Sequence, residues 1–213
     1  PSGRMPGRWG LGIAILWTAL SLIWATLMGT WGFWACALAI AFSWAYSAPP
    51  VRLKKNGWWG NAACALSYEG LAWITGTAVM LGGEWPGASA LSLALLYSIG
   101  AHGIMTLNDF KAIEGDRQMG VDSLPVQLGA KGAARVACLF MWVPQVVVAA
   151  LLFNWQLPWH ALVVLVLSFM QWPLMWKFLK QPVERALYVS AFGVPMFVSG
   201  MMVSAWGLRQ LNA

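Results

Sequence analysis

Seven apolar runs, each long enough to cross a lipid bilayer as a helix, fill most of this 213-residue chain. Hydrophobic residues make up 60% of the sequence and charged residues only 9%, whereas a soluble domain carries about 25% charged residues. The runs lack the alternating pattern of a membrane β-barrel. We therefore expect an all-α integral membrane protein, one transmembrane domain over residues 1–213, with spans at residues 9–28, 32–48, 58–81, 88–107, 133–153, 159–176 and 186–206.

Positive charge is distributed unevenly over the loops between these spans. Every Lys and Arg except Arg209 falls on the side of the membrane where the N-terminus lies. The positive-inside rule makes that side cytoplasmic. The net charge of +6 then belongs to loops that meet anionic ligands or lipids. No nucleic-acid partner is needed to explain it. The three cysteines lie inside apolar runs without metal-ligand spacing, so we interpret them as packing residues.

Four of the seven acidic residues gather directly after the fourth span: Asp109, Glu114, Asp116 and Asp122. Ionisable groups at a membrane are costly and usually mark a site. If the helix of the fourth span continues through Asp116, then Asp109 and Asp116 lie on one face, two turns apart. Paired carboxylates suit Mg²⁺, which often shares its remaining positions with substrate phosphates. The alternative is a solvated loop whose charges only keep it hydrated.

Basic side chains near this stretch could bind the phosphates. Lys111 and Arg117 lie within it, and Arg52 and Lys54 follow a pair of prolines that ends the second span. The alternative for Arg52 and Lys54 is an ordinary positive-inside anchor. Arg4, in a turn-rich segment before the first span, could likewise reach an anion or simply flank the membrane.

Two polar side chains within the spans are further candidates for binding the substrate. Glu69 lies well inside the third span, where it should face the interior of the bundle, either lining a substrate cavity or bonding to a neighbouring helix. His102 lies seven residues before Asp109 and shares its helix face. It could bind the substrate's metal or a carboxylate, or it could be an interior histidine with satisfied hydrogen bonds.

The order of residues in this stretch resembles a known family. Residues 108–120, Asn-Asp-Phe-Lys-Ala-Ile-Glu-Gly-Asp-Arg-Gln-Met-Gly, with Ser-Leu-Pro-Val-Gln-Leu-Gly at 123–129, resemble the second acidic motif of the UbiA-type intramembrane prenyltransferases. The similarity is greatest to their chlorophyll and bacteriochlorophyll synthase branch. Residues 46–54 resemble the basic loop of that branch, and residues 1–8 resemble the segment after the family's first acidic motif.

The resemblance implies a nine-helix bundle with two acidic motifs facing each other at the cytoplasmic side of the photosynthetic inner membrane. These motifs hold Mg²⁺ and the diphosphate of a geranylgeranyl or phytyl donor. The acceptor is the propionate of chlorophyllide or bacteriochlorophyllide. The motif assigns catalysis to Asp109 and Asp116, adds Glu114 as a third metal ligand, and places Asn108 among the substrate-binding residues.

Two departures from the family pattern matter. The first acidic motif and the helices before it are absent, so we expect this chain to be the C-terminal part of a longer protein and inactive alone. Many family members also have Asp where this chain has Ala112.

The alternative functions are a prenyltransferase with a quinone-precursor or haem acceptor, or a non-enzymatic pigment-binding membrane protein.

Overall fold

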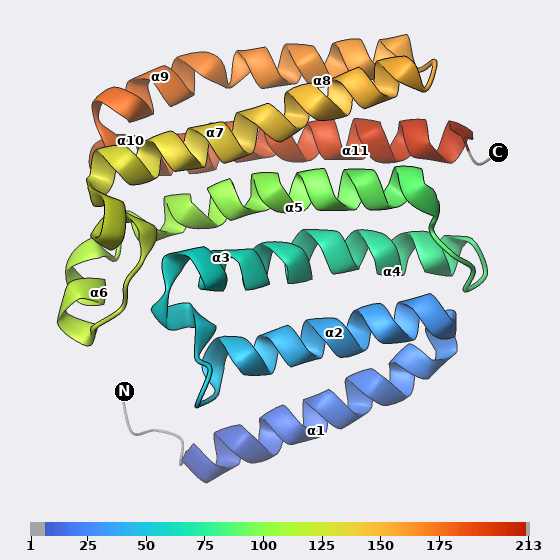
Figure 1. Cartoon of the computed structure of the whole chain (residues 1–213), viewed down its shortest axis with the longest axis horizontal. Helices are drawn as coiled ribbons and strands as arrows, with labels where there is room; N and C mark the ends of the chain where they lie inside the picture. The colour runs from blue at the N-terminus through green and yellow to red at the C-terminus, as the bar shows by residue number, and fades with distance from the viewer. Residues whose placement is uncertain (1–6, 212–213) are drawn as a thin grey trace.

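Helices account for nearly all of the computed structural model, which describes residues 7–211. Within these residues, seven membrane-length helical segments run up and down in succession (Figure 1). They are α1 (Gly7–Ala25), α2 (Gly29–Ser47), α3 (Gly57–Ala65) continued by α4 (Leu71–Met80), α5 (Gly87–Asp109), α7 (Leu124–Asn154), α8 (Pro158–Met170) continued by α9 (Trp172–Lys180), and α10 (Pro182–Tyr188) continued by α11 (Val194–Leu211).

Each of the seven predicted spans corresponds to one of these segments. By length and apolar composition alone, five helical stretches among the described residues could cross a membrane. The first of them, Arg8–Ser47, contains both α1 and α2, which Figure 1 shows as two antiparallel helices. The α3–α4 segment is interrupted by a π-helical turn at Leu66–Gly70. The prediction of an all-α membrane bundle is therefore confirmed.

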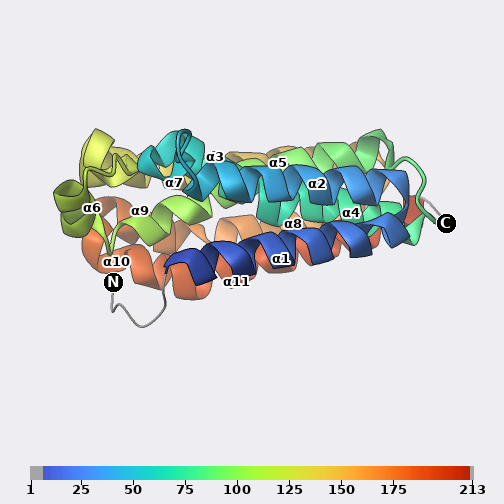
Figure 2. The same cartoon turned by 90° about the horizontal axis from the view of Figure 1, so that it is seen from below.

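One end of the bundle carries the charged connections, and we call it the charged end. The loop between α2 and α3, the short helix α6 (Ile113–Met119) and the α9–α10 junction all lie there (Figure 1). Figure 2, a view from below, places α6 and the start of α3 at this same end. Among residues 7–211, eight basic residues lie in these connections or in the helix turns next to them: Arg52, Lys54, Lys55, Lys111, Arg117, Lys177, Lys180 and Arg185. Arg8 lies at the start of α1, Lys131 and Arg135 lie in the first half of α7, and Arg209 lies near the end of α11.

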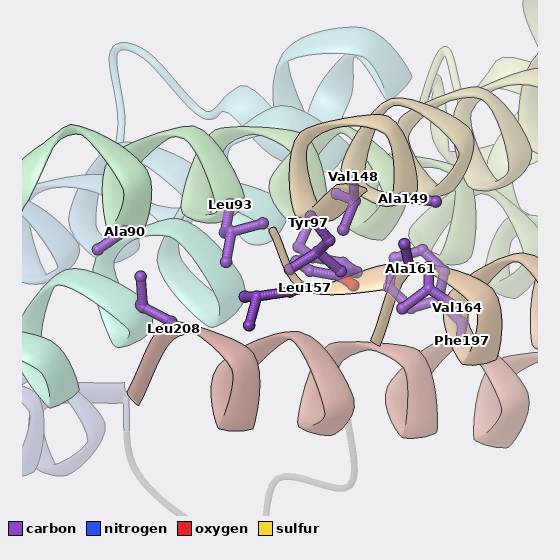
Figure 3. Packing of buried hydrophobic residues seen from close by; sticks show 11 residues of the cluster. Ala90, Leu93, Tyr97, Val148, Ala149, Leu157, Ala161, Val164, Phe197 and Leu208 are labelled. Carbon is purple, nitrogen blue, oxygen red and sulfur yellow. The ribbon is translucent and has the colours of Figure 1, made fainter. Parts of the chain in front are cut away.

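Helix α5 lies in the middle of the bundle and packs against α3, α4, α7 and α11. Small residues let the neighbouring backbones approach, as is common between membrane helices. A Cβ on Gly103 would lie 2.7 Å from the Ala137 carbonyl oxygen of α7. Tyr97 is fully buried, and its hydroxyl lies 2.7 Å from Ser204 Oγ of α11. Figure 3 shows Tyr97 among the apolar side chains from α5, α7, α8 and α11 that form this core.

Two buried glutamines connect the last spans of the bundle. Gln171 lies at the junction of α8 and α9, and its Nε2 donates to Gln145 Oε1 of α7 at 2.9 Å. Gln145 Nε2 donates back to Gln171 Oε1 at 3.3 Å. Both side chains are 0% exposed. Since lipid offers no replacement partner for an amide, the pair fixes where the α8–α9 junction meets α7.

We expect Gln145→Leu to destabilise the protein by roughly 1–3 kcal/mol, because Gln171 Oε1 loses its donor inside an apolar environment and Gln171 Nε2 keeps only the Leu167 carbonyl oxygen as acceptor. The double variant Gln145→Leu/Gln171→Leu should recover part of this loss, since neither amide is then left unpaired. Unfolding in mixed detergent and sodium dodecyl sulfate micelles measures both changes. A double variant whose loss equals the sum of the two single losses would contradict a specific pair.

Candidate functional site

The acidic stretch does not continue the helix of the fourth span. Helix α5 ends at Asp109, and α6 begins only at Ile113. The chain leaves the helix at Ala112, whose dihedral angles are φ −112° and ψ 2°. Phe110 keeps helical dihedral angles, is buried, and packs edge-on against Phe178 of α9, with ring centroids 5.1 Å apart. The prediction of one helix through Asp116 is therefore wrong, and the shared helix face cannot be the reason why Asp109 and Asp116 meet.

A hydrogen-bond chain fixes the position of the Asp109 carboxylate. Asn61 Nδ2 of α3 donates to Asp109 Oδ2 at 3.1 Å and lies 3.4 Å from Thr106 Oγ1. The Thr106 hydroxyl in turn donates to the His102 carbonyl oxygen at 2.9 Å. Asp109 is half-buried at the end of α5. Its second oxygen, Oδ1, makes no hydrogen bond within residues 7–211 and is left for a ligand.

The second carboxylate comes from α6. Asp116 is half-buried, and two backbone hydrogen bonds connect it to the end of α5: the Ala112 N–H donates to the Asp109 carbonyl oxygen at 3.0 Å, and the Asp116 N–H donates to the Ala112 carbonyl oxygen at 2.8 Å. Glu114 is exposed on the same helix, where its Oε1 accepts a hydrogen bond from Gln118 Nε2 at 3.0 Å. Across residues 7–211, no three His, Cys, Asp or Glu side chains gather as a metal site would require. The structure thus connects the two aspartates through one short turn of backbone, whereas the Glu114 side chain is paired with Gln118.

This pair fits a hard divalent cation in one specific way. Two carboxylates are too few to hold Mg²⁺ alone. They suffice where phosphate oxygens and water complete the six positions around the ion. An arrangement of this kind can bind a metal together with a phosphorylated ligand, and Asp109 and Asp116 are the candidate ligands among the described residues.

The basic loop is joined to the acidic stretch by backbone hydrogen bonds. The Asp122 N–H donates to the Lys55 carbonyl oxygen at 2.8 Å, and the Gly57 N–H donates to the Asp122 carbonyl oxygen at 2.7 Å. Asn56 then caps α3, with its Oδ1 accepting from Trp58 N at 3.0 Å. We call these contacts the loop seam. They place the basic loop beside the acidic stretch, as the sequence suggested.

Four of the predicted phosphate-binding cations are exposed at the charged end. Arg52 and Lys54 extend from the loop between α2 and α3, and Lys111 and Arg117 extend from the turn before α6 and from α6 itself. Asn108 is exposed in the last turn of α5. Arg4 lies outside the described residues.

The two intramembrane candidates lie within the spans, with His102 next to the first turn of α3 and Glu69 farther along the same span as α3. His102 is 6% exposed, and its Nε2 donates to the Trp58 carbonyl oxygen at 3.2 Å. Its ring packs against Phe140 of α7, with centroids 5.1 Å apart. Glu69 is half-buried in the π-helical turn between α3 and α4, deeper in the bundle. His102 thus occupies a packed interior position, whereas Glu69 keeps part of its surface accessible.

Sequence reasoning did not assign a role to Asn61, the partner of Asp109. The available signal was an amide inside an otherwise apolar run, at the charged end of the third span. Tyr46 of α2 and Cys64 of α3 were also missed, and both lie near enough to Asp109 to interact with its charge. Nothing in their spacing could reveal this, because α2, α3 and α5 meet only in the folded bundle.

Comparison with known proteins places these features in a wider group. The model of the UbiA prenyltransferase family matches residues 1–201. The bacteriochlorophyll synthase 33 kDa chain of Cereibacter sphaeroides is 50% identical over all of this chain and 70% of its own length. Its counterpart from Rhodobacter capsulatus is 48% identical over 98% of this chain and 69% of its own length. The chloroplastic chlorophyll synthase of Arabidopsis thaliana is 38% identical over 92% of this chain and 49% of its own length.

A solved structure supports the fold independently. In work on digeranylgeranylglyceryl phosphate synthase in membranes, a chain superimposes on this one with a TM-score of 0.73. The match covers 98% of this chain and 72% of that one, at 20% sequence identity. At this identity the likeness concerns the helical arrangement alone.

Proposed function

The chain belongs to the UbiA prenyltransferase family, on its bacteriochlorophyll and chlorophyll synthase branch, and from this premise we propose that it esterifies a bacteriochlorophyllide or chlorophyllide with a polyprenyl group. The resemblance noted in the acidic stretch is thereby confirmed, and the protein is a multi-pass membrane prenyltransferase. The observation that carries the substrate assignment is the 50% identity to a bacteriochlorophyll synthase chain along the whole sequence.

The proposed donor is geranylgeranyl or phytyl diphosphate. The bond between its allylic carbon and the diphosphate oxygen breaks, and diphosphate leaves with the bonding electrons. An oxygen of the acceptor's propionate carboxylate then bonds to the allylic carbon, which forms the ester. Both steps need the leaving diphosphate to be stabilised and water to be excluded from the reactive carbon.

The charged end provides the first requirement. Members of this family generally depend on a divalent metal, and we propose that Asp109 and Asp116 hold Mg²⁺ in this protein. Bound Mg²⁺ would offset the charge that develops on the departing diphosphate. Asn61 keeps the Asp109 carboxylate in place, and the exposed cations Arg52, Lys54, Lys111 and Arg117 are available to bind the phosphate oxygens.

The apolar spans provide the second requirement, the exclusion of water, because they surround the reactive carbon with hydrocarbon. The prenyl chain and the tetrapyrrole can reach the charged end through the membrane. By the positive-inside rule, the charged end faces the cytoplasm, and the proposed location is the photosynthetic inner membrane. Glu69 remains a candidate for contacting the acceptor from within the bundle, since it is only half-buried.

An acceptor assay tests this function. Membranes with the protein expressed from its complete gene receive geranylgeranyl diphosphate, Mg²⁺ and one of three acceptors: bacteriochlorophyllide, a quinone precursor or haem. We expect a prenyl ester with bacteriochlorophyllide alone. Product with another acceptor only would move the protein to a different branch. Pigment binding with no transfer to any acceptor would favour the non-enzymatic alternative.

The basic loop should govern donor binding. Replacing both Arg52 and Lys54 with Ala removes two exposed cations, and we expect the donor's KM to rise by roughly five- to tenfold, corresponding to about 1 kcal/mol. The KM for the acceptor should change little. The matched control is Arg209→Ala, at the opposite end of the bundle. An unchanged donor KM in the double variant would exclude the basic loop from the site.

Asn61 should act by holding Asp109. Loss of a residue that orients a metal ligand typically lowers metal affinity or activity by roughly 10- to 100-fold, and we expect this of Asn61→Leu. Titration with Mg²⁺ at saturating donor measures the effect, and excess Mg²⁺ should restore part of the rate. Asn154→Leu, an exposed amide at the far end of α7, serves as control. If the Asn61→Leu enzyme shows the same Mg²⁺ dependence as the wild type, Asn61 does not act by holding Asp109.

A further inference from the structure

A cavity of about 250 Å³ opens between α7 and α9, away from the loop seam and the aspartates. We call it the α7–α9 groove. Its walls include Leu139 of α7 and Met175 of α9, with Arg135 and Leu179 at one end and Trp142 and Trp172 at the other. Leu139 is 57% exposed and Trp172 is 50% exposed, so the groove opens on the outer surface of the bundle. Figure 1 shows α7 and α9 next to each other near the charged end.

The deep end of the groove has an unsatisfied hydrogen-bond donor. The indole Nε1 of Trp142 is buried and makes no hydrogen bond within residues 7–211. The ring is held by Trp172 at 5.4 Å and by Phe169 at 5.9 Å between centroids. An unpaired N–H in an apolar environment is costly, and the surrounding membrane core offers no water to replace the partner. A ligand in this groove would therefore be favoured if it brought a carbonyl oxygen.

The shallow end of the groove is cationic. Arg135 lines it and is exposed, and Lys131 lies one helical turn before it on α7, also exposed. No acidic residue is among those that line the groove. A long basic side chain at this depth can extend toward the headgroup region while its stem stays in the apolar layer. This end is thus suited to an anionic headgroup.

The order of these groups along α7, from the charged end inward, matches one kind of molecule. Arg135 and Trp142 are seven residues apart on α7, which is about 10 Å along the helix axis. A phospholipid places its phosphate at the headgroup level, its ester carbonyls below it and its acyl chains deeper still. The positive charge of Arg135 and Lys131 favours an anionic lipid, and the aromatic and aliphatic side chains that line the groove favour contact with its acyl chain.

We propose that the α7–α9 groove binds one anionic phospholipid. Its phosphate pairs with Arg135, an ester carbonyl oxygen accepts the Trp142 Nε1 proton, and an acyl chain lies against Leu139 and Met175. The site is separate from the one that binds the prenyl donor, because it opens on the outside of the bundle and contains neither aspartate. Lipid bound there contributes to how α9 is held against α7.

Native mass spectrometry tests the proposal on the protein expressed from its complete gene and purified in detergent. The probes are dioleoyl phosphatidylglycerol and dioleoyl phosphatidylcholine, added at equal concentration. We expect the wild-type protein to retain phosphatidylglycerol at least about fivefold more strongly, which corresponds to about 1 kcal/mol. Arg135→Gln should reduce this retention to the level of phosphatidylcholine. Arg209→Gln, at the other end of the bundle, should leave it unchanged.

Further variants keep the test decisive if Arg135→Gln folds poorly. Arg135→Lys keeps the charge and should retain most of the preference, and Trp142→Phe keeps the ring while removing the N–H, so it should weaken retention of both lipids. Equal retention of the two lipids by the wild-type protein would overturn the proposal, as would an unchanged preference in Arg135→Gln. Displacement of the lipid by millimolar inorganic phosphate would mean that the site binds only a free anion, which would overturn it as well.

Discussion

Asp109→Asn is expected to lower prenyl transfer by at least about a hundredfold, the range seen when a group that stabilises developing charge is removed. The change keeps the size of the side chain and deletes its negative charge. Asn61 Nδ2 can still donate to the remaining side-chain oxygen, so the end of α5 should keep its structure. The loss would therefore arise from the missing metal ligand. Rates of ester formation in membranes with matched amounts of the variant and the wild-type protein measure it.

The control for this variant comes from the same stretch. Asp122 is exposed, and it holds the loop seam through its backbone groups. Asp122→Asn keeps those groups and should retain most of the wild-type rate. Comparable losses in both variants would mean that the charge of the whole stretch matters, and a wild-type rate in Asp109→Asn would remove Asp109 from the metal site.

The second large effect is expected at the loop seam. A Cβ at Gly57 would overlap the backbone nitrogen of Leu124 and lie 2.9 Å from the carbonyl carbon of Ser123. Backbone atoms cannot rotate away, so Gly57→Val must separate the basic loop from the acidic stretch. Overpacking of this kind costs about 1–3 kcal/mol or more. We expect a lower midpoint of thermal unfolding together with a prenyl-transfer rate below one tenth of wild type.

Gly76→Val provides the matched control, because a Cβ there has open space within 4 Å and the residue lies in α4 of the same span. It should unfold and react nearly as the wild-type protein does. If Gly57→Val keeps full activity, the contact between the two loops is unnecessary for the site. If it unfolds normally but reacts slowly, the seam serves to position the loops more than to stabilise the bundle.

Hydrophobicity was sufficient to predict the spans, because lipid requires each crossing segment to be continuous, apolar and helical. The distribution of basic residues also indicated which connections share one end of the bundle. Neither pattern could reveal where α5 ends. The helix breaks at Ala112, and the neighbouring Phe110 packs against Phe178, a residue far away in the sequence. Neither feature can be seen in the apolar pattern, so the expected helix through Asp116 was wrong.

The candidate site was predictable in composition and only partly in geometry. The gathering of carboxylates was enough to propose Asp109 and Asp116 as candidates without any structure. The hydrogen bond from Asn61 to Asp109 and the loop seam at Asp122 join segments separated by tens of residues. Such pairings follow from how α3 packs on α5, and α3 does so only after the chain has folded.

Binding of geranylgeranyl diphosphate in the absence of acceptor tests the central claim most directly, because it isolates the charged end from the acceptor. Isothermal titration of the purified protein, expressed from its complete gene, would be done with Mg²⁺, with EDTA, and with the Asp109→Asn variant. We predict binding by the wild-type protein in Mg²⁺, with at least about tenfold weaker binding in EDTA or in the variant, a difference of about 1.4 kcal/mol. Equal affinity under all three conditions would contradict a metal-assisted diphosphate site at Asp109 and Asp116.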